Sequence, residues 1–225
     1  MNTLKDIQVL IWDFDGTLYE PVSELWHTIR EAEYRVIMEV NGWDHERAEE
    51  EFKKLYKKTT PSATQTVGKL TGMTTTQAAL YMEKFYDRRE YVGKDDKLVA
   101  MFEALKNYRH FILANGVRAR LEETLEVLGV PVSTFEYIVT SEVSGENKPS
   151  DKGFRYILEK TKLPAAAHLM IGDRPAVDLD PAQKIGMKTC FITWDKSEQI
   201  KHTKYDEVVE EVYEISSLLS AKGSA

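Results

Sequence analysis

The stretch Ile7-Gln-Val-Leu-Ile-Trp-Asp13-Phe-Asp15-Gly-Thr-Leu18 joins an apolar segment to two aspartates and a glycine. The apolar part predicts a buried β-strand, in which side chains two positions apart point to the same side. Asp13 and Asp15 can therefore face one ligand, while Gly16 lets the chain turn sharply behind them. Two carboxylates so close together need a cation or a shared proton. The plainer alternative is a surface turn with two solvated aspartates, but the position directly after a buried strand favours a functional site.

The composition is that of a globular protein with a substantial interior. With 225 residues, of which 42% are hydrophobic, the chain can form one sizeable domain or a core domain with a smaller insert. Its formal charge of -7 gives no general attraction to nucleic acid or to an anionic membrane. The sequence contains neither a basic leader with a long apolar run nor a membrane-length apolar segment, so we expect a cytoplasmic protein. Cys190 is the single cysteine, which excludes an internal disulfide and a thiolate metal cage.

Residues 18–92 are predicted to form a helical insert, because their apolar side chains recur with helical spacing. The pair Asn41-Gly42 is suited to end the first helix, and Asp44 is suited to cap the second. Thr74 and Gln77 have the form of a capping box that opens another helix. We expect four helices here, with most aromatic residues packed between them and some lining a cleft.

Residues 1–17 and 93–225 are predicted to form an α/β core. After Gly93, helical patterns alternate with short apolar strands, which predicts a parallel sheet covered by helices on both faces. The later strands are expected at 111–114, 137–139, 168–171 and 188–192, and the helices at 97–108, 118–128, 151–160 and 175–185. Residues 207–212 fit either a last short strand or the start of a helix.

The carboxyl ends of the predicted strands carry most of the chemically useful side chains. Ligands gather at this edge of a parallel sheet, so residues that directly follow a strand are the candidates for a site. They comprise acids, one amide, one lysine and a glycine: Asp13, Asp15, Asn115, Gly116, Lys148, Asp173 and Asp178. Arg174, beside them, is interpreted as a structural residue that pairs with a neighbouring acid.

This set of residues suits phosphoryl transfer. Carboxylates at one sheet edge supply the oxygen ligands that Mg2+ prefers, so Mg2+ is the expected cofactor. Asp13, at the end of its strand, is the best-placed nucleophile for a phosphoryl group whose charge is neutralised by the metal and a lysine. Asp15 lies on the mobile side of the turn, where it can protonate a leaving alcohol and later activate water.

The order of the motifs resembles the haloacid dehalogenase superfamily over nearly the whole predicted core. Asp-Phe-Asp-Gly-Thr-Leu comes first, followed by a strand with Asn115-Gly116, then Lys148-Pro149, then Gly172-Asp173-x4-Asp178. A lone Asp-x-Asp-Gly string would be weak, but motifs in the right order and structural context make the resemblance specific. It implies a Rossmann-like core with a helical cap inserted after the first motif.

The resemblance also implies a role for each residue that matches a motif. Asp13 would be the nucleophile and a Mg2+ ligand, and Asp15 the acid/base that also binds the metal through its backbone carbonyl. Lys148 would be the catalytic phosphate clamp, and Asp173 the second metal carboxylate. Asp178 would orient the metal shell or contact Lys148.

The second motif departs from the family pattern. It normally ends in Ser or Thr, whose hydroxyl binds the phosphoryl group, whereas this chain has Ala114. Asn115 and the backbone N–H groups near Gly116 are expected to bind phosphate instead. The loss of one preorganised donor can lower turnover roughly a hundredfold or more.

Three functions are consistent with these residues. The leading hypothesis is a Mg2+-dependent phosphatase of small phosphomonoesters, such as a sugar phosphate or a nucleotide, acting through an aspartyl phosphate. Asp15 argues against a dehalogenase, which needs no acid there. The alternatives are a phosphomutase, or a regulatory protein that binds phosphate esters with little turnover because of Ala114. The expected partner is a small phosphorylated metabolite, not a nucleic acid or a membrane, and the chain is expected to be a monomer or homodimer.

Overall fold

A parallel β-sheet is the centre of the molecule, whose computed structural model describes residues 4–58, 62–194 and 204–223. Within these residues, six strands pair in the order β3-β2-β1-β4-β5-β6, and every neighbouring pair is parallel. The strands are β1 (Val9–Trp12), β2 (Arg109–Leu113), β3 (Tyr137–Val139), β4 (His168–Gly172), β5 (Lys188–Ile192) and β6 (Glu207–Val209). The predicted α/β fold with a parallel Rossmann-like sheet is confirmed.

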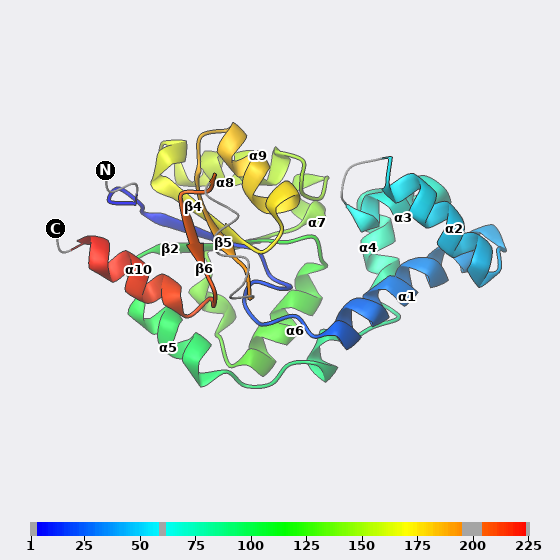
Figure 1. Cartoon of the computed structure of the whole chain (residues 1–225), viewed down its shortest axis with the longest axis horizontal. Helices are drawn as coiled ribbons and strands as arrows, with labels where there is room; N and C mark the ends of the chain where they lie inside the picture. The colour runs from blue at the N-terminus through cyan, green and yellow to red at the C-terminus, as the bar shows by residue number, and fades with distance from the viewer. Residues whose placement is uncertain (1–3, 59–61, 195–203, 224–225) are drawn as a thin grey trace.

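Helices cover both faces of this sheet (Figure 1). One face packs against α5 (Asp96–Ala104), α6 (Arg118–Leu128) and α10 (Glu214–Gly223), and the other against α8 (Lys152–Thr161) and α9 (Asp180–Lys184). Alternation along β1 explains the two layers, because Leu10 and Trp12 join one apolar cluster while Val9 and Ile11 join the other. A short helix, α7 (Ser141–Ser144), follows β3.

The element bounds differ from the predictions in a few places. Strand β1 begins at Val9 rather than Ile7, and the helix expected at 97–108 ends at Ala104. The helix expected at 175–185 is a π-helical turn (Pro175–Leu179) followed by α9. Pro181 has no N–H to donate to the carbonyl four residues earlier, which favours a wider turn before it. At the ambiguous C-terminal stretch, the strand alternative is correct and α10 begins only at Glu214.

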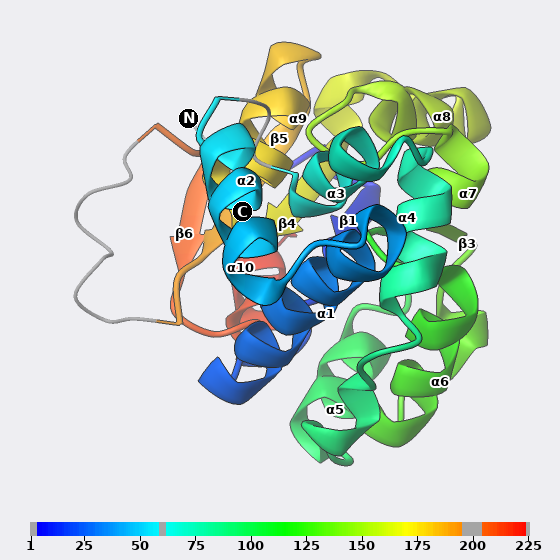
Figure 2. The ribbon, with the colours of Figure 1, turned by 90° about the vertical axis from the view of Figure 1, so that its right-hand side faces the viewer.

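Helices α1 (Ser23–Asn41), α2 (His45–Tyr56), α3 (Ala63–Thr71) and α4 (Thr75–Met82) lie together to one side of the sheet (Figures 1 and 2). They pack around an apolar cluster of their own. The predicted ends are confirmed: Gly42 ends α1 with a φ of 66°, the Asp44 side chain accepts from the backbone of Arg47, and Thr74 and Gln77 form the capping box. All four helices fall within 18–92, but the boundaries of the insert stay a prediction.

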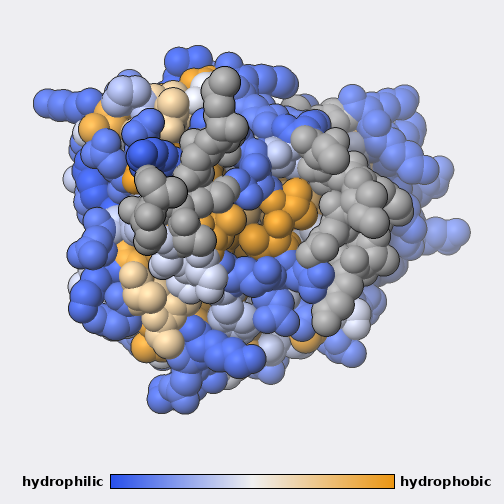
Figure 3. Space-filling view, turned by 60° about the vertical axis from the view of Figure 1, so that its left-hand side comes forward, coloured by the Kyte–Doolittle hydropathy of each residue, from blue (hydrophilic) through white to orange (hydrophobic). Residues whose placement is uncertain are grey.

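One face of the described chain is mostly polar. Hydrophilic side chains cover most of the face in Figure 3 that is not drawn in grey, with smaller hydrophobic areas among them. Among the helices that the structure describes, none combines the length and the apolar character that a membrane span requires. Cys190 is fully buried in the sheet, as expected for a small core residue.

Candidate active site

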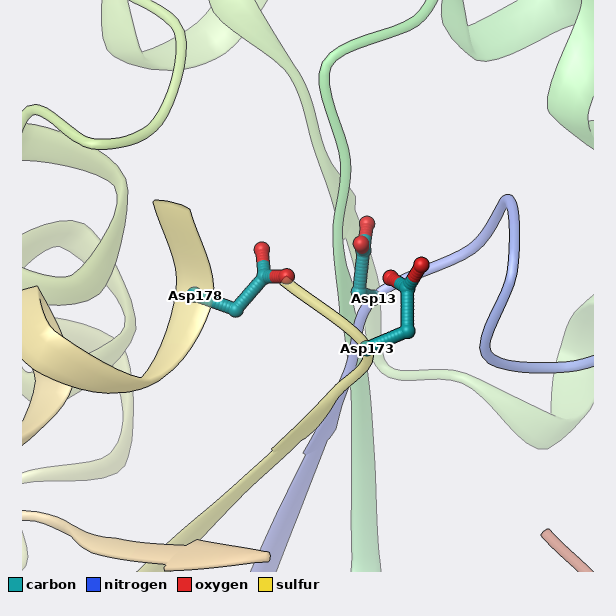
Figure 4. A group of neighbouring side chains, drawn as sticks. All are labelled: Asp13, Asp173 and Asp178. Atoms are coloured by element: carbon teal, nitrogen blue, oxygen red, sulfur yellow. The ribbon is translucent and has the colours of Figure 1, made fainter. Parts of the chain in front are cut away.

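The candidate site lies where the order of the strands reverses. From β1 the chain passes to β2 and β3 on one side and then returns to β4 on the other side of β1. The crevice at the carboxyl ends of two such strands is where ligands bind in α/β sheets. Asp13 follows β1 and Asp173 follows β4, and Figure 4 shows both carboxylates beside that of Asp178, which comes from the π-helical turn. Carboxylate oxygens of these three residues lie within 4.8 Å of one another.

The turn behind Asp13 fits closely against Asp173. Gly16 has a φ of +81°, and a Cβ atom there would overlap the carboxylate of Asp173. The Thr17 hydroxyl is 3.5 Å from Asp173 Oδ1, to which it donates, and the Trp194 indole donates to the Gly16 carbonyl over 2.6 Å. These contacts fix the spacing between the first and fourth motifs, so the glycine is needed for close approach as well as for the turn.

Lys148 lies under Asp13 and is almost fully buried. Its Nζ is 2.7 Å from Asp13 Oδ1 and 2.5 Å from Asp178 Oδ1, so the contact expected between Asp178 and Lys148 is present, and a contact with Asp13 is added to it. The Asn115 side chain holds the Lys148 backbone: Nδ2 donates to the carbonyl over 2.9 Å, and Oδ1 accepts from the N–H over 2.8 Å. Asn115 thus positions the lysine, and its expected contact with phosphate stays a prediction.

Arg174 reaches the candidate nucleophile, a contact that the sequence interpretation did not assign. Its Nη2 is 3.3 Å from Asp13 Oδ2, and its Nε is 3.9 Å from both Asp173 Oδ1 and Asp178 Oδ2. It pairs with acids, as expected of a structural residue, but it also lines the cavity in front of Asp13. Its place directly after Asp173 in the fourth motif is the sequence signal that could have indicated this contact.

The charges of the site are unevenly shared among the three acids. Burial alone would raise the pKa of Asp13, but Lys148 and Arg174 outweigh it and lower the pKa to about 2. Burial and the charge of Asp13 raise the pKa of Asp173 well above its usual value, and the same two causes raise that of Asp178. Asp13 is therefore ionised, whereas burial first, and then the charge of Asp13, disfavours a negative charge on Asp173 and Asp178.

This arrangement fits a divalent cation. Mg2+ binds carboxylate oxygens and keeps several waters, and the clustered oxygens of Asp13, Asp173 and Asp178 offer such ligands. A bound cation would offset the burial and the repulsion from Asp13 that together raise the pKa of Asp173. Asp178 belongs to this cluster, and its Oδ1 also makes the expected contact with Lys148.

Asp15 is held by residues that the sequence interpretation missed. Arg88, in the short 3-10 helix η1 (Arg88–Glu90), donates from Nε to Asp15 Oδ1 over 2.7 Å and from Nη2 to Oδ2 over 2.9 Å. The Tyr19 hydroxyl also donates to Oδ1. Glu83 binds the opposite end of Arg88. Arg88 belongs to no recognisable motif. The one sequence signal is that it lies in the segment that connects α4 to the core.

A cavity of about 400 Å³ opens in front of these residues. Asp13, Asp15, Asn115 and Asp173 line it, as predicted, together with Ala114, so these parts of the first, second and fourth motifs meet in one space. Gly116 is not among its lining residues. Helices α1 to α4 and the segment after them supply the remaining wall: Trp26, Ile29, Arg30, Glu33, Tyr56, Ser62, Ala63, Thr64, Met82, Tyr86 and Arg88.

Glu33 and Arg30 are the charged residues that α1 brings to this wall. Glu33 is 2% exposed, and its Oε2 is 2.6 Å from Arg30 Nη1. Burial raises the pKa of Glu33 to about 8, against the opposing pull of Arg30. The Arg30 guanidinium also lies over the rings of Phe52 and Tyr56, at 4.7 and 5.5 Å from their centres.

Comparison with protein families now identifies the class to which this fold and site belong. A family profile described as haloacid dehalogenase-like hydrolase matches residues 10–192, which run from the second residue of β1 to the end of β5 and include all the motifs above. The chain therefore belongs to the haloacid dehalogenase-like hydrolases, and the resemblance of its motifs to that superfamily is confirmed.

Individual relatives match shorter stretches. A glyceraldehyde 3-phosphate phosphatase from Pyrococcus abyssi is 30% identical over 118 residues, which are 52% of this chain and 48% of the relative. The pyrimidine 5'-nucleotidase YjjG of Escherichia coli is 30% identical over 123 residues, 54% of each chain. The alignments thus span about half the length of these curated relatives.

Solved structures share the fold over nearly the whole chain. The crystal structure of a phosphatase of this family from Thermococcus onnurineus superposes with a TM-score of 0.65, covering 95% of this chain and 98% of that one, at 18% identity. At so low an identity the likeness concerns the fold, so the reaction has to be argued from the site.

Proposed function

We propose that this chain is a Mg2+-dependent phosphatase that hydrolyses small phosphomonoesters through an aspartyl phosphate on Asp13. The observation that carries the proposal is the surroundings of the Asp13 carboxylate: Asp13 directly follows β1, lines the cavity and is paired with Lys148 and Arg174. Both cations keep it ionised, as a nucleophile must be, and both can attract a phosphoryl group.

The position of Asp15 supports phosphate-ester chemistry. In the forward step, an Asp13 oxygen forms a bond to phosphorus as the bond to the leaving oxygen breaks, and that oxygen needs a proton. Asp15 lines the same cavity and can deliver this proton, then take one from the water that attacks the aspartyl phosphate. A reaction that expels a halide needs no such proton, so Asp15 favours esters over haloacids.

Mg2+ is proposed as the cofactor, held by the carboxylates of Asp13 and Asp173 and the backbone carbonyl of Asp15, with Asp178 alongside. When bound, it would neutralise part of the charge on the phosphoryl oxygens. Lys148 and Arg174 stay in contact with the acids and orient the substrate phosphate toward Asp13.

The wall from α1 to α4 supports a small substrate. A cavity of about 400 Å³ accommodates a phosphate and a leaving group no larger than a sugar or nucleoside. The similarity to a glyceraldehyde 3-phosphate phosphatase and a pyrimidine 5'-nucleotidase supports a small phosphorylated metabolite as substrate. We propose residues 18–92 as the cap that carries this wall.

Ala114 supports one other function, a protein that binds phosphate esters but turns them over slowly. It lines the cavity next to Asn115 without a hydroxyl to donate. The two functions are separated by a panel of phosphomonoesters assayed for phosphate release with added Mg2+ and with EDTA. Hydrolysis that requires Mg2+ is expected. Mg2+-dependent binding without turnover on any ester would favour the regulatory alternative, and hydrolysis unaffected by EDTA would contradict the cofactor.

A further inference from the structure

Arg88 links the end of the helical insert directly to the candidate acid/base. One side of its guanidinium pairs with both oxygens of Asp15, at 2.7 and 2.9 Å. Its third nitrogen, Nη1, donates to both oxygens of Glu83, at 2.7 and 2.8 Å. Such two-bond pairs fix the plane of a carboxylate as well as its position. Because Arg88 is 3% exposed, these contacts are little weakened by water.

The arginine is held from further sides. The Tyr86 hydroxyl accepts from Nη2 over 3.1 Å, and the Tyr86 ring lies 5.0 Å from the guanidinium carbon. A Cβ atom at Gly116 would lie 3.4 Å from Nη2, an ordinary contact distance, so the guanidinium lies directly against the loop after β2. Arg88 is therefore fixed between the insert and the loop after β2.

The contacts of Asp15 distinguish its two oxygens. Oδ1 accepts from Arg88 Nε and from the Tyr19 hydroxyl, whereas Oδ2 accepts only from Arg88 Nη2 among the described residues. A carboxylate oxygen has two acceptor positions, so Oδ1 is fully used and Oδ2 keeps one position. Oδ2 is thus the atom with capacity to hold a proton for the reaction.

We infer that Arg88 is a positioning residue that holds Asp15 so that Oδ2 transfers the proton, an inference that rests on the proposed phosphatase function. In the first step the proton passes from Oδ2 to the leaving oxygen as the Asp13–phosphorus bond forms and the ester bond breaks. In the second step water bonds to phosphorus, its proton passes to Oδ2, and the Asp13–phosphorus bond breaks. Both steps balance without a further reactant.

The inference predicts a dependence on the leaving group. A purely structural role of Arg88 would change the hydrolysis of all esters alike. A role in placing Asp15 matters most when the leaving oxygen is a strong base that needs its proton during bond cleavage. The probes are p-nitrophenyl phosphate, which releases a weakly basic phenolate, and phenyl phosphate, which releases a strongly basic one. The two esters differ only by a nitro group.

The test compares kcat/KM for the two esters in Mg2+ for the wild type, Arg88→Lys, Glu83→Gln and Arg89→Lys. A lysine keeps the charge but cannot hold both oxygens of Asp15 in one plane. In Arg88→Lys, the ratio of phenyl to p-nitrophenyl phosphate hydrolysis should fall by about tenfold or more. Glu83→Gln should shift it less in the same direction. Arg89 is the matched control, because it is exposed and pairs with Asp87 and Glu123 instead.

The ratio of kcat/KM for the two esters does not depend on the fraction of folded enzyme. A variant that folds poorly therefore still gives a valid ratio. If Arg88→Lys yields no folded protein, the ratio in Glu83→Gln decides. An equal loss on both esters, or the same shift in Arg89→Lys, overturns the inference while leaving the phosphatase proposal intact. In an Asp15→Asn background, Arg88→Lys should no longer change the ratio. If the wild type hydrolyses neither of these esters nor any ester of the panel above, the proposed function itself is wrong.

Discussion

Asp13 and Asp15 are two residues apart and line one cavity, yet the cations that hold them come from different parts of the molecule. Asp13 is paired with Lys148 and Arg174, both from loops of the α/β core. Asp15 is paired with Arg88, which follows the last helix of the insert. The charge of Asp13, the proposed nucleophile, is thus set within the core, whereas the placement of Asp15, the proposed acid/base, depends on how the insert meets the core.

Amide substitutions of the two aspartates should separate these roles most strongly. Asp13→Asn is expected to reduce phosphate release from both p-nitrophenyl and phenyl phosphate by roughly ten-thousand-fold or more, because it removes the nucleophile. Asp15→Asn is expected to reduce phenyl phosphate hydrolysis by about a hundredfold or more, and p-nitrophenyl phosphate much less. Steady-state phosphate release measures both. Asp151→Asn, at an exposed ion pair with Arg155, is the control. Retained activity in Asp13→Asn would refute the nucleophile.

Ala114, which belongs to the core, lacks the hydroxyl that Ser or Thr would supply at this position of the second motif. Ala114→Thr should raise kcat by about tenfold to a hundredfold, because the new hydroxyl can donate to the phosphoryl group as charge develops on it. Ala114→Val has the same shape without the donor and should not raise it. The measurement is kcat on a phosphomonoester with Mg2+. An equal gain in both variants, or none in the threonine variant, would contradict this account of Ala114.

The smallest effect is expected for the stability of the insert, where Glu33 is buried and pairs with Arg30. Burial raises the pKa of Glu33 from the ordinary value of 4.5 to about 8. Between these two pH values the folded chain therefore retains a proton that the unfolded chain releases. The free energy of unfolding should therefore fall as pH rises from 4.5 toward 8 and level off above. Glu33→Gln removes this loss and should raise the free energy of unfolding near the upper end of that range by about 1–3 kcal/mol.

Denaturant unfolding at several pH values measures this difference. The exposed residue Glu31, on the same helix and paired with His45, gives the matched control Glu31→Gln. A Glu33→Gln curve that runs parallel to that of the wild type would show that Glu33 titrates normally. Glu33 would then contribute to the free energy of unfolding as an ordinary ion pair with Arg30 does. The electrostatics of the insert would differ less from those of the core than we infer.

The sequence predicted the fold well because its signals are local. Short apolar runs located the strands, and Gly42, Asp44 and the Thr74–Gln77 box marked helix ends that the structure contains. The strand ends then indicated which polar residues would meet, since parallel strands bring their carboxyl ends to one edge. Asp13 and Asp173 meet there, as expected.

Arg88 was missed for a physical reason. It contacts Asp15 although 73 residues separate them, and nothing in the neighbouring sequence distinguishes it from the exposed Arg89. The same holds for Glu33, whose spacing on α1 marks it as one more helical residue. Burial separates it from Glu31, and burial is a property of the packed chain.

By itself, the sequence determined the parallel sheet, the helical insert and the set of acids and lysine gathered at the strand ends. These follow from periodicity and from turn and capping chemistry, which act over a few residues. The tertiary structure decided which cation holds which aspartate, that Asn115 binds the backbone of Lys148, and that Asp15 is joined to the insert through Arg88. Ion pairs and pKa values depend on the distances between charged groups and on the exclusion of water. Both of these are set by the packing of the folded chain.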